Sequence, residues 1–304
     1  MRMHETVLLD EAVDSLNIKA DGRYVDATFG RGGHSNKILS RLNGQGQLLV
    51  IDQDPMAIEQ ANELAQEDAR VIVQHGPFET LREMIKASFD SGVDGILFDL
   101  GVSSPQLDEA ERGFSFSQTG PLDMRMDTSG GETAAQWLNQ ADWKDISKVL
   151  WRYGEEKNAT KIAKEIVIYR DEVKPLETTA ELVGIIEKIN KYSKKHPATR
   201  SFQAIRIYIN RELEQVENVL PESLTCLNNK GRLVVISFHS LEDRLVKRFF
   251  KKNASQGAFD KRMPIAIEKE ARLKIIGKPV KASKNEIENN PRSRSAIMRV
   301  AEKT

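Results

Sequence analysis

Cysteine and long apolar runs are scarce in this 304-residue chain, and each absence excludes a class of protein. The single cysteine, Cys226, excludes an intramolecular disulfide and a metal site built from several cysteines. No apolar run reaches the roughly 18 residues of a membrane-spanning helix. Acids at Asp10, Glu11 and Asp14 exclude the apolar core of a signal peptide. We therefore expect a cytoplasmic protein that needs no metal.

The charges that are present are unevenly spread along the chain. Hydrophobic residues make up 39% and charged residues 30%, which is typical of a globular protein with one large domain or two modest ones. Residues 1–130 hold 11 Lys and Arg against 22 Asp and Glu, whereas residues 131–304 hold 34 against 23. This asymmetry indicates a polyanionic partner for the second half. A two-lobed surface that binds no nucleic acid would produce the same asymmetry.

Strand and helix patterns alternate over residues 1–105, which predicts a parallel sheet covered by helices on both faces. From about residue 108 a loop rich in Gly, Ser, Asp and Met leads into helical runs, the last of them at 200–220, and buried strands return only at 232–238 and 296–300. We predict an α/β core of residues 1–107 and 212–304, interrupted by a helical substrate-recognition domain at 108–211. The insertion leaves from the carboxyl end of the fourth strand, where open sheets bind ligands, and is expected to form one wall of the site. Over residues 1–105, the predicted strands lie at 24–27, 47–51, 71–74 and 95–99, and the predicted helices lie near 35–42, 55–66 and 79–88.

Three glycines, Gly30, Gly32 and Gly33, join the first predicted strand to the next helix. Glycine lets the backbone turn tightly and approach a bound molecule closely. The second strand ends in Asp52, whose carboxylate can accept hydrogen bonds from both hydroxyls of a ribose. The pattern predicts a cofactor that contains adenosine. A turn that only reverses the chain is the alternative.

The residues around this turn favour S-adenosylmethionine over NAD. The turn lacks the third glycine of the dinucleotide motif G-x-G-x-x-G. The fourth strand ends in Asp99, and the following segment carries Ser103 and Ser104 before a proline, where amino-group methyltransferases receive the base. These three side chains are candidate acceptors for the protons of a target amino group, although a Ser-Pro turn is also ordinary loop geometry. Direct methyl transfer needs neither a metal nor a covalent cysteine.

His34 and Phe78 are expected near the same cleft. A histidine after a glycine turn often only helps to cap the next helix, and a phenylalanine after a strand is often part of the core. Phe78 could instead stack on an adenine ring. The sequence leaves both pairs of alternatives open.

Basic residues interleaved with aromatic ones gather in the second half, and contacts of cations with phosphates position a nucleic acid without reading its sequence. Each basic run is equally typical of a solvated helix face. The predicted RNA contacts are Lys194, Lys195, His196, Arg200, Arg206, Arg244, Arg292 and Arg294.

Eight motifs, in order over essentially the whole chain, resemble those of one family, the MraW type of ribosomal RNA small subunit methyltransferase H. They read HETVLLDEA from His4, DATFGRGGHS from Asp26, DLGVSSPQLD from Asp99, RGFSF from Arg112, GPLDMRM from Gly120, HPATRSFQAIRI from His196, SFHSLEDR from Ser237 and NPRSRSA from Asn290.

The resemblance implies a Rossmann-like class I methyltransferase fold with an inserted helical domain. It also implies that the protein uses S-adenosylmethionine to methylate the exocyclic N4 of a cytosine in the decoding centre of 16S rRNA, with the small ribosomal subunit as its partner. The target base would lie in a loop or be flipped out of its stack. The cofactor contacts implied by the matching motifs fall on Gly32, Gly33, His34, Asp52, Phe78, Asp99 and Gln106.

Three other functions compete with this interpretation. A NAD-dependent oxidoreductase is disfavoured by the glycine turn, and an RNA-binding assembly factor with a vestigial fold is disfavoured by the intact Asp52 and Asp99. A methyltransferase acting on cytosine or adenine in DNA stays open on chemical grounds. The oligomeric state is a separate question, which the sequence does not answer, and a homodimer stays open.

Overall fold

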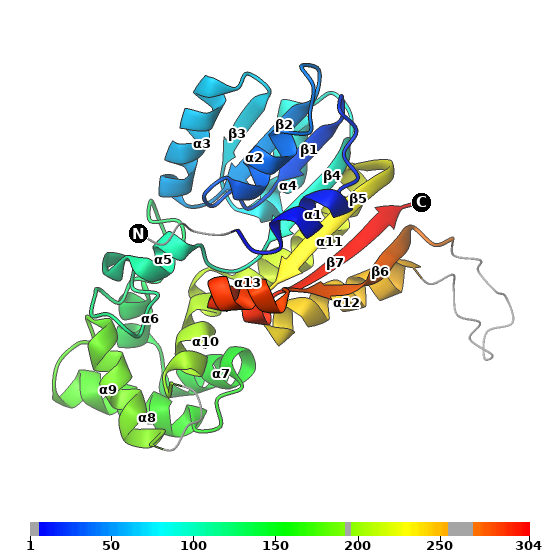
Figure 1. Cartoon of the computed structure of the whole chain (residues 1–304). Coiled ribbons are helices and arrows are strands. Elements are labelled where there is room, and N and C mark those ends of the chain that lie inside the picture. Colours follow the sequence, from blue (N-terminus) through cyan, green and yellow to red (C-terminus); the bar gives the residue numbers. More distant parts are fainter. Residues whose placement is uncertain (1–5, 192–195, 255–269) are drawn as a thin grey trace, which may run out of the picture. The chain divides into compact units, whose positions relative to one another are not determined.

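A computed structural model describes residues 6–191, 196–254 and 270–304 of the chain (Figure 1). It divides into two compact units, Met1–Gly101 with Leu213–Thr304 and Val102–Glu212. The sheet unit is the first of these, and the helical unit is the second. The helical unit begins at 102 rather than at the predicted 108, so Ser103, Ser104 and Gln106 belong to it.

One seven-stranded sheet organises the sheet unit, with the strand order β3-β2-β1-β4-β5-β7-β6. The strands from β3 to β5 in this order are parallel, and β7 runs antiparallel to both of its neighbours. This confirms the predicted Rossmann-like class I methyltransferase fold. The strands are β1 Arg23–Asp26, β2 Gln47–Asp52, β3 Val71–His75, β4 Val93–Asp99, β5 Leu227–Ser237, β6 Leu273–Lys281 and β7 Ile297–Lys303.

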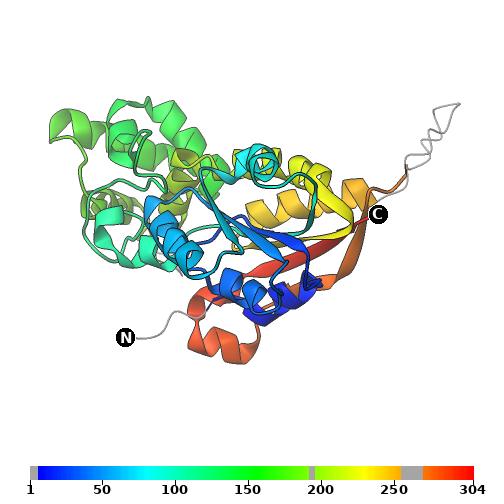
Figure 2. The ribbon, with the colours of Figure 1, turned by 90° about the horizontal axis from the view of Figure 1, so that it is seen from above.

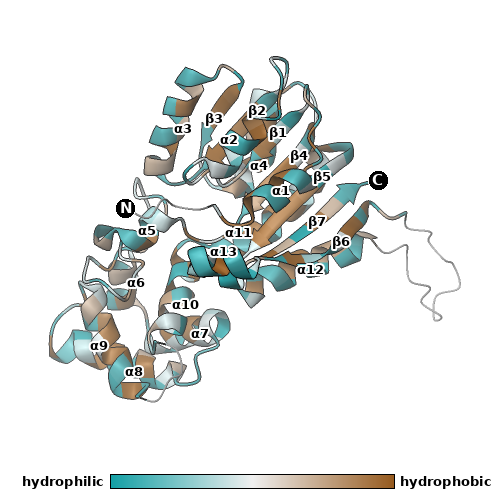
Figure 3. Cartoon of the chain, in the orientation of Figure 1, coloured by the Kyte–Doolittle hydropathy of each residue, from teal (hydrophilic) through white to brown (hydrophobic). Residues whose placement is uncertain are grey.

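Helices cover both faces of this sheet, as Figure 2 shows from above. Two separate apolar clusters form beneath them: α1, α2 and α3 contribute to one, and α4, α11 and α12 contribute to the other. The central strands are buried on both faces and are therefore apolar along their length, which Figure 3 shows as brown strands. The helices are α1 Leu9–Ser15, α2 Gly33–Leu39, α3 Pro55–Glu67, α4 Leu81–Ser88, α11 Glu212–Cys226, α12 Ser240–Ala254 and α13 Lys284–Asn289.

The helical unit has a core of its own, formed by apolar residues that recur at helical spacing. Its described residues contain no β-strand, and its one isolated bridge joins Pro121 to Thr178. The buried Arg112 donates to the carbonyls of Arg125 and Met126 and thereby orders the loop before the first long helices. The helices are α5 Ser104–Asp108, α6 Ala134–Gln140, α7 Trp143–Gly154, α8 Ala159–Glu172, α9 Thr179–Ile189 and α10 Thr199–Ile209.

The structure corrects the sequence prediction at two further places. The helical run expected at 200–220 is two helices, because Arg211 adopts a φ of +50° between α10 and α11. The strand β6 was missed because Gly277, with a φ of +66°, and Pro279 interrupt its pattern. None of the helices in the described residues has the length and apolarity to cross a membrane.

Candidate functional site

Three aspartates end the neighbouring strands β2, β1 and β4 of the sheet unit. Burial raises the pKa of Asp26 and of Asp52 to about 6. Burial, together with the negative charges of Asp26 and Glu242, raises the pKa of Asp99 well above its ordinary value. Carboxyl groups that share a site in this way resist ionising together. The carboxyl edge of the sheet is thus suited to a ligand that carries positive charge.

Asp52 is tied to the glycine turn. Its Oδ2 accepts the backbone N–H of Gly30 at 2.8 Å, and its Oδ1 accepts the N–H of Asp54 at 2.9 Å. Gly30 and Gly32 adopt φ values of +56° and +72°, a region that favours glycine. Because each carboxylate oxygen has about two acceptor positions, one on each oxygen remains for a ligand hydroxyl.

His34 lies in the first turn of α2 and is 4% exposed. Its Nε2 lies 3.2 Å from the carbonyl oxygen of Val7, which assigns the proton to Nε2 and leaves the lone pair on Nδ1. Burial lowers the pKa of the imidazole to about 4, so the ring is neutral at physiological pH. The Nδ1 atom lies 3.9 Å from Oδ2 of Asp99. The N-cap of α2 is Gly32, which has no side chain to cap the helix, and the ring of His34 is directed to the carbonyl of Val7.

Asp99 combines a fixed backbone with an unused side-chain oxygen. Its N–H donates to Oγ1 of Thr28 at 2.7 Å, which ties the end of β4 to the segment before the turn. Its Oδ1 is buried and has no hydrogen-bond partner among the described residues. Because buried polar atoms are rarely left unpaired, this oxygen marks a position for a ligand donor.

Phe78 follows β3 and packs against the core of the sheet unit. Its ring meets that of Phe98 edge to face, with centroids 5.7 Å apart and an interplanar angle of 76°. The side chain stays partly exposed, so its core contact and the predicted contact with an adenine are compatible.

The structure brings Gly32, Gly33, His34, Asp52 and Asp99 to one edge of the sheet unit, and Gln106 belongs to the helical unit. Gln106 is buried in α5, where its Oε1 accepts the N–H of Ser103 at 2.9 Å in a capping box. Ser104 is the first residue of the same helix.

The predicted RNA contacts fall into three groups. Lys194 and Lys195 lie outside the described residues. In the helical unit, His196 stacks on Phe116 with ring centroids 4.4 Å apart, and Arg200 donates to the carbonyl of Glu155 at 3.1 Å. Arg206 forms two hydrogen bonds of 2.7 Å with Glu212, which is a structural ion pair. Arg244, Arg292 and Arg294 are exposed in the sheet unit.

The excess of positive charge does not lie in the helical unit. Residues 102–212 contain 17 Lys and Arg and 17 Asp and Glu, whereas residues 213–304 contain 19 and 11. In this last segment, exposed cations follow one side of α12, because they recur at three- and four-residue spacing. These α12 cations are Arg244, Lys247, Arg248, Lys251 and Lys252.

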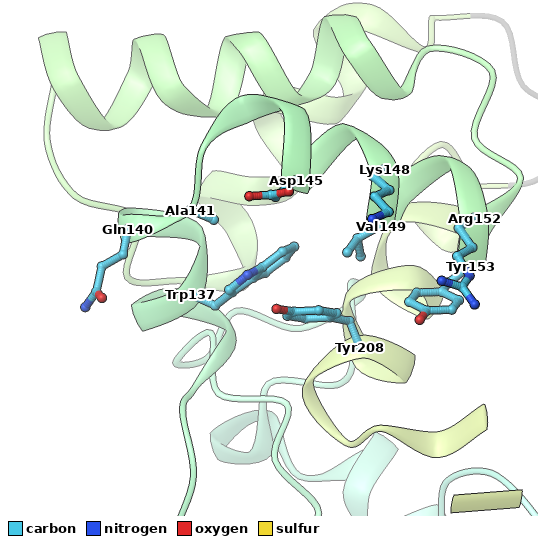
Figure 4. A pocket seen from close by; sticks show the side chains of 9 residues that line it. All are labelled: Trp137, Gln140, Ala141, Asp145, Lys148, Val149, Arg152, Tyr153 and Tyr208. Atoms are coloured by element: carbon cyan, nitrogen blue, oxygen red, sulfur yellow. The ribbon is translucent and has the colours of Figure 1, made fainter. Parts of the chain in front are cut away.

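A pocket of about 540 Å³ opens within the helical unit (Figure 4). The rings of Trp137 and Tyr208 lie side by side in it, with centroids 4.4 Å apart, and Lys148 and Arg152 contribute cationic side chains. Sequence reasoning missed this pocket, because its residues come from three helices and form no local motif.

The chain matches known proteins over its full length. Residues 1–304 match the family described as the MraW methylase family. A protein from Dechloromonas aromatica named "Ribosomal RNA small subunit methyltransferase H" is 51% identical over 304 residues, with 99% of this chain and 98% of that protein covered. A protein of the same name from Shewanella oneidensis is 52% identical over 306 residues, with 99% and 97% covered. A solved rRNA methylase from Streptococcus thermophilus gives a TM-score of 0.42 at 10% identity, with 99% of this chain and 98% of that one covered.

Proposed function

This chain belongs to the MraW methylase family, and from that premise we propose that it methylates 16S rRNA with S-adenosylmethionine. The proposed acceptor is the exocyclic N4 of a cytosine in the decoding centre. The related proteins named for small-subunit rRNA methylation support the rRNA substrate. The observation that carries the cofactor is the glycine turn beside three strand-end aspartates, of which Asp26 is buried and Asp52 and Asp99 are partly exposed.

The residues of the sheet unit fit the methyl donor. Asp52 has one acceptor position left on each oxygen for the two ribose hydroxyls, and Phe78 offers a partly exposed ring to the adenine. The unpaired Oδ1 of Asp99 suits a donor group of the cofactor or of the target base. Bound there, S-adenosylmethionine supplies an electrophilic methyl group on a positively charged sulfur.

The chemistry of a cytosine amino group explains why an acceptor is needed next to that methyl group. The lone pair of N4 is delocalised into the ring, so the enzyme has to orient the nitrogen and accept a hydrogen bond from one of its protons. Asp99 is the proposed acceptor, because the raised pKa of its carboxyl also suits it to take up the proton that N4 releases. Ser103 and Ser104 in the following segment remain further proposed acceptors.

Two surfaces support binding of an RNA. The α12 cations suit the phosphate backbone, and this contact is independent of sequence. In the helical unit, the pocket of Trp137 and Tyr208 suits an unstacked base, because aromatic rings bind bases by stacking and Lys148 and Arg152 can neutralise a neighbouring phosphate. A substrate in the small ribosomal subunit would place the protein in the cytoplasm.

The direct test is to identify the methylated product. The protein is incubated with S-adenosylmethionine labelled in its methyl group and with small subunits, free 16S rRNA or DNA, and nucleosides are then analysed by mass spectrometry. With the natural protein we expect labelled N4-methylcytidine in 16S rRNA. With the Asp99→Ala variant in its place we expect no labelled N4-methylcytidine. Label in DNA alone would favour the competing DNA substrate, and absence of label from every nucleic acid would refute the proposal.

A further inference from the structure

The N-terminal residues Thr6–Leu8, which we call the strap, lie against the glycine turn. A Cβ atom added to Gly33 would collide with Oγ1 of Thr6, so the strap fills the space where a side chain would stand. The carbonyl oxygen of Val7 accepts the Nε2 proton of His34 at 3.2 Å. The strap therefore contacts two successive residues of the proposed cofactor turn.

The strap is itself held by a residue from the other end of the chain. Leu8 has a φ of +51° and a ψ of +37°, a left-handed conformation that a leucine adopts only where its surroundings impose it. Its backbone N–H donates to Oε1 of Glu286 at 2.8 Å, and its side chain is 1% exposed in the core. Glu286 lies in α13, whose first turn is capped by the hydroxyl of Ser283.

We propose that Glu286 is a positioning residue for the cofactor site. By accepting the N–H of Leu8 it keeps the strap against Gly33 and keeps the carbonyl of Val7 in place for His34. That hydrogen bond fixes the ring of His34 with Nδ1 towards Asp99. Without Glu286, the strap relaxes from the left-handed conformation and both contacts with the turn loosen. The proposal rests on the proposed function, because it assigns the turn to S-adenosylmethionine.

The test compares three variants of the full chain. Glu286→Ala removes the acceptor, Glu286→Gln keeps an oxygen that can accept the N–H of Leu8, and Glu288→Ala removes an exposed acid from the same helix. Calorimetry gives the Kd for S-adenosylmethionine and for its demethylated product, and hydrogen exchange is followed on the ligand-free proteins. For Glu286→Ala we expect about tenfold weaker binding, the equivalent of losing one charge-assisted hydrogen bond, and faster exchange of the amides of 33–39.

The other two variants should bind within about threefold of the natural protein, since a neutral acceptor retains most of a hydrogen bond to a backbone N–H. The affinity for RNA should not change in any of them. Unchanged cofactor binding by Glu286→Ala, together with faster exchange near Leu8, would overturn the proposal and leave Glu286 as an anchor of the N-terminal segment alone.

A second variant covers the case in which Glu286→Ala does not fold. Thr6→Gly removes the contact with Gly33 and leaves Glu286 in place, and the same tenfold loss is expected of it; normal binding would overturn the proposal. Failure of the natural protein to bind either ligand would refute the proposed function instead. In that case the exchange of residues 33–39 still shows whether Glu286 holds the turn.

Discussion

The two parts of the chain that build the sheet differ in charge and in where the charges lie. Residues 1–101 carry 9 Lys and Arg against 17 Asp and Glu, and three of their strands end in aspartates whose pKa burial raises. Residues 213–304 carry 19 against 11, and the cations of α12 are exposed. One sheet thus joins a partly buried acidic edge, suited to a small cationic ligand, to an exposed basic helix, suited to a polyanion.

This difference shows that net charge alone locates neither site. The helical unit carries many cations, but it is balanced overall, and Arg112 and Arg206 are used for internal contacts. A buried charge acts on a ligand at short range through a low dielectric, whereas an exposed charge acts over about 10 Å at 0.1 M salt. The acidic part should therefore determine cofactor affinity, and the basic part should determine the salt dependence of RNA binding.

Replacing Asp52 should have the largest effect, and it should change cofactor binding without changing RNA binding. We expect Asp52→Ala to weaken S-adenosylmethionine binding about 100-fold, because two hydrogen bonds to a charged acceptor are lost. The affinity for RNA should stay unchanged. Asp52→Asn keeps one oxygen for Gly30 and should be intermediate. Calorimetry checks these values, with the exposed Asp90→Ala as the control. Equal cofactor affinity of Asp52→Ala and the natural protein would refute the ribose assignment.

Neutralising the α12 cations should weaken RNA binding without changing cofactor binding. In the variant with Lys247, Arg248 and Lys251 changed to Gln, we expect about tenfold weaker RNA binding at physiological salt. The slope of log K against log salt concentration should fall by about 2, which corresponds to three lost contacts with single-stranded phosphates. Cofactor affinity should not change.

The control for this variant changes three exposed lysines of the helical unit to Gln, namely Lys157, Lys161 and Lys188. If this control lowers the slope as much as the α12 variant does, the backbone contacts belong to the helical unit and the comparison between the two parts of the sheet no longer holds.

The pH dependence of cofactor binding should be the smallest effect. The pKa of Asp52 is raised to about 6, so its carboxyl takes up a proton as the pH falls through 6 and can then no longer accept from both hydroxyls. We expect S-adenosylmethionine to bind several-fold more weakly at pH 5 than at pH 7.5. Asp52→Asn should show a flatter profile. The product S-adenosylhomocysteine has the same two ribose hydroxyls, so its binding should weaken over the same pH range, and a flat profile for the product would contradict the ribose assignment of Asp52.

The sequence predicted those features that depend on local patterns. Strands such as 47–51 and 95–99 lie in the structure at 47–52 and 93–99, because strands buried on both faces are continuous apolar runs. Asp52 and Asp99 follow such strands, and their place at the carboxyl edge comes with the parallel order. The parts that could not be predicted depend on contacts between distant residues.

Two examples show this limit. Most residues of the edge strand β6 are exposed, and it carries lysines and a glycine, so neither alternation nor a continuous apolar run is visible. The contact of Leu8 with Glu286 spans 278 residues and leaves no periodicity in the sequence. Its only local sign, the left-handed Leu8, is a backbone angle that no residue type at that position indicates.

Because β4 pairs with β5, the centre of the sheet can form only late in translation. Strand β4 ends at Asp99, and its parallel neighbour in the centre of the sheet is not finished until Ser237. At synthesis rates of about 5–20 residues per second, the ribosome needs on the order of ten seconds to make the intervening segment. During this interval the helical unit can fold around its own core, but the edge of β4 that later pairs with β5 has no neighbouring strand. We therefore expect the nascent chain to be most prone to aggregation, and most dependent on chaperones, in the interval before β5 emerges.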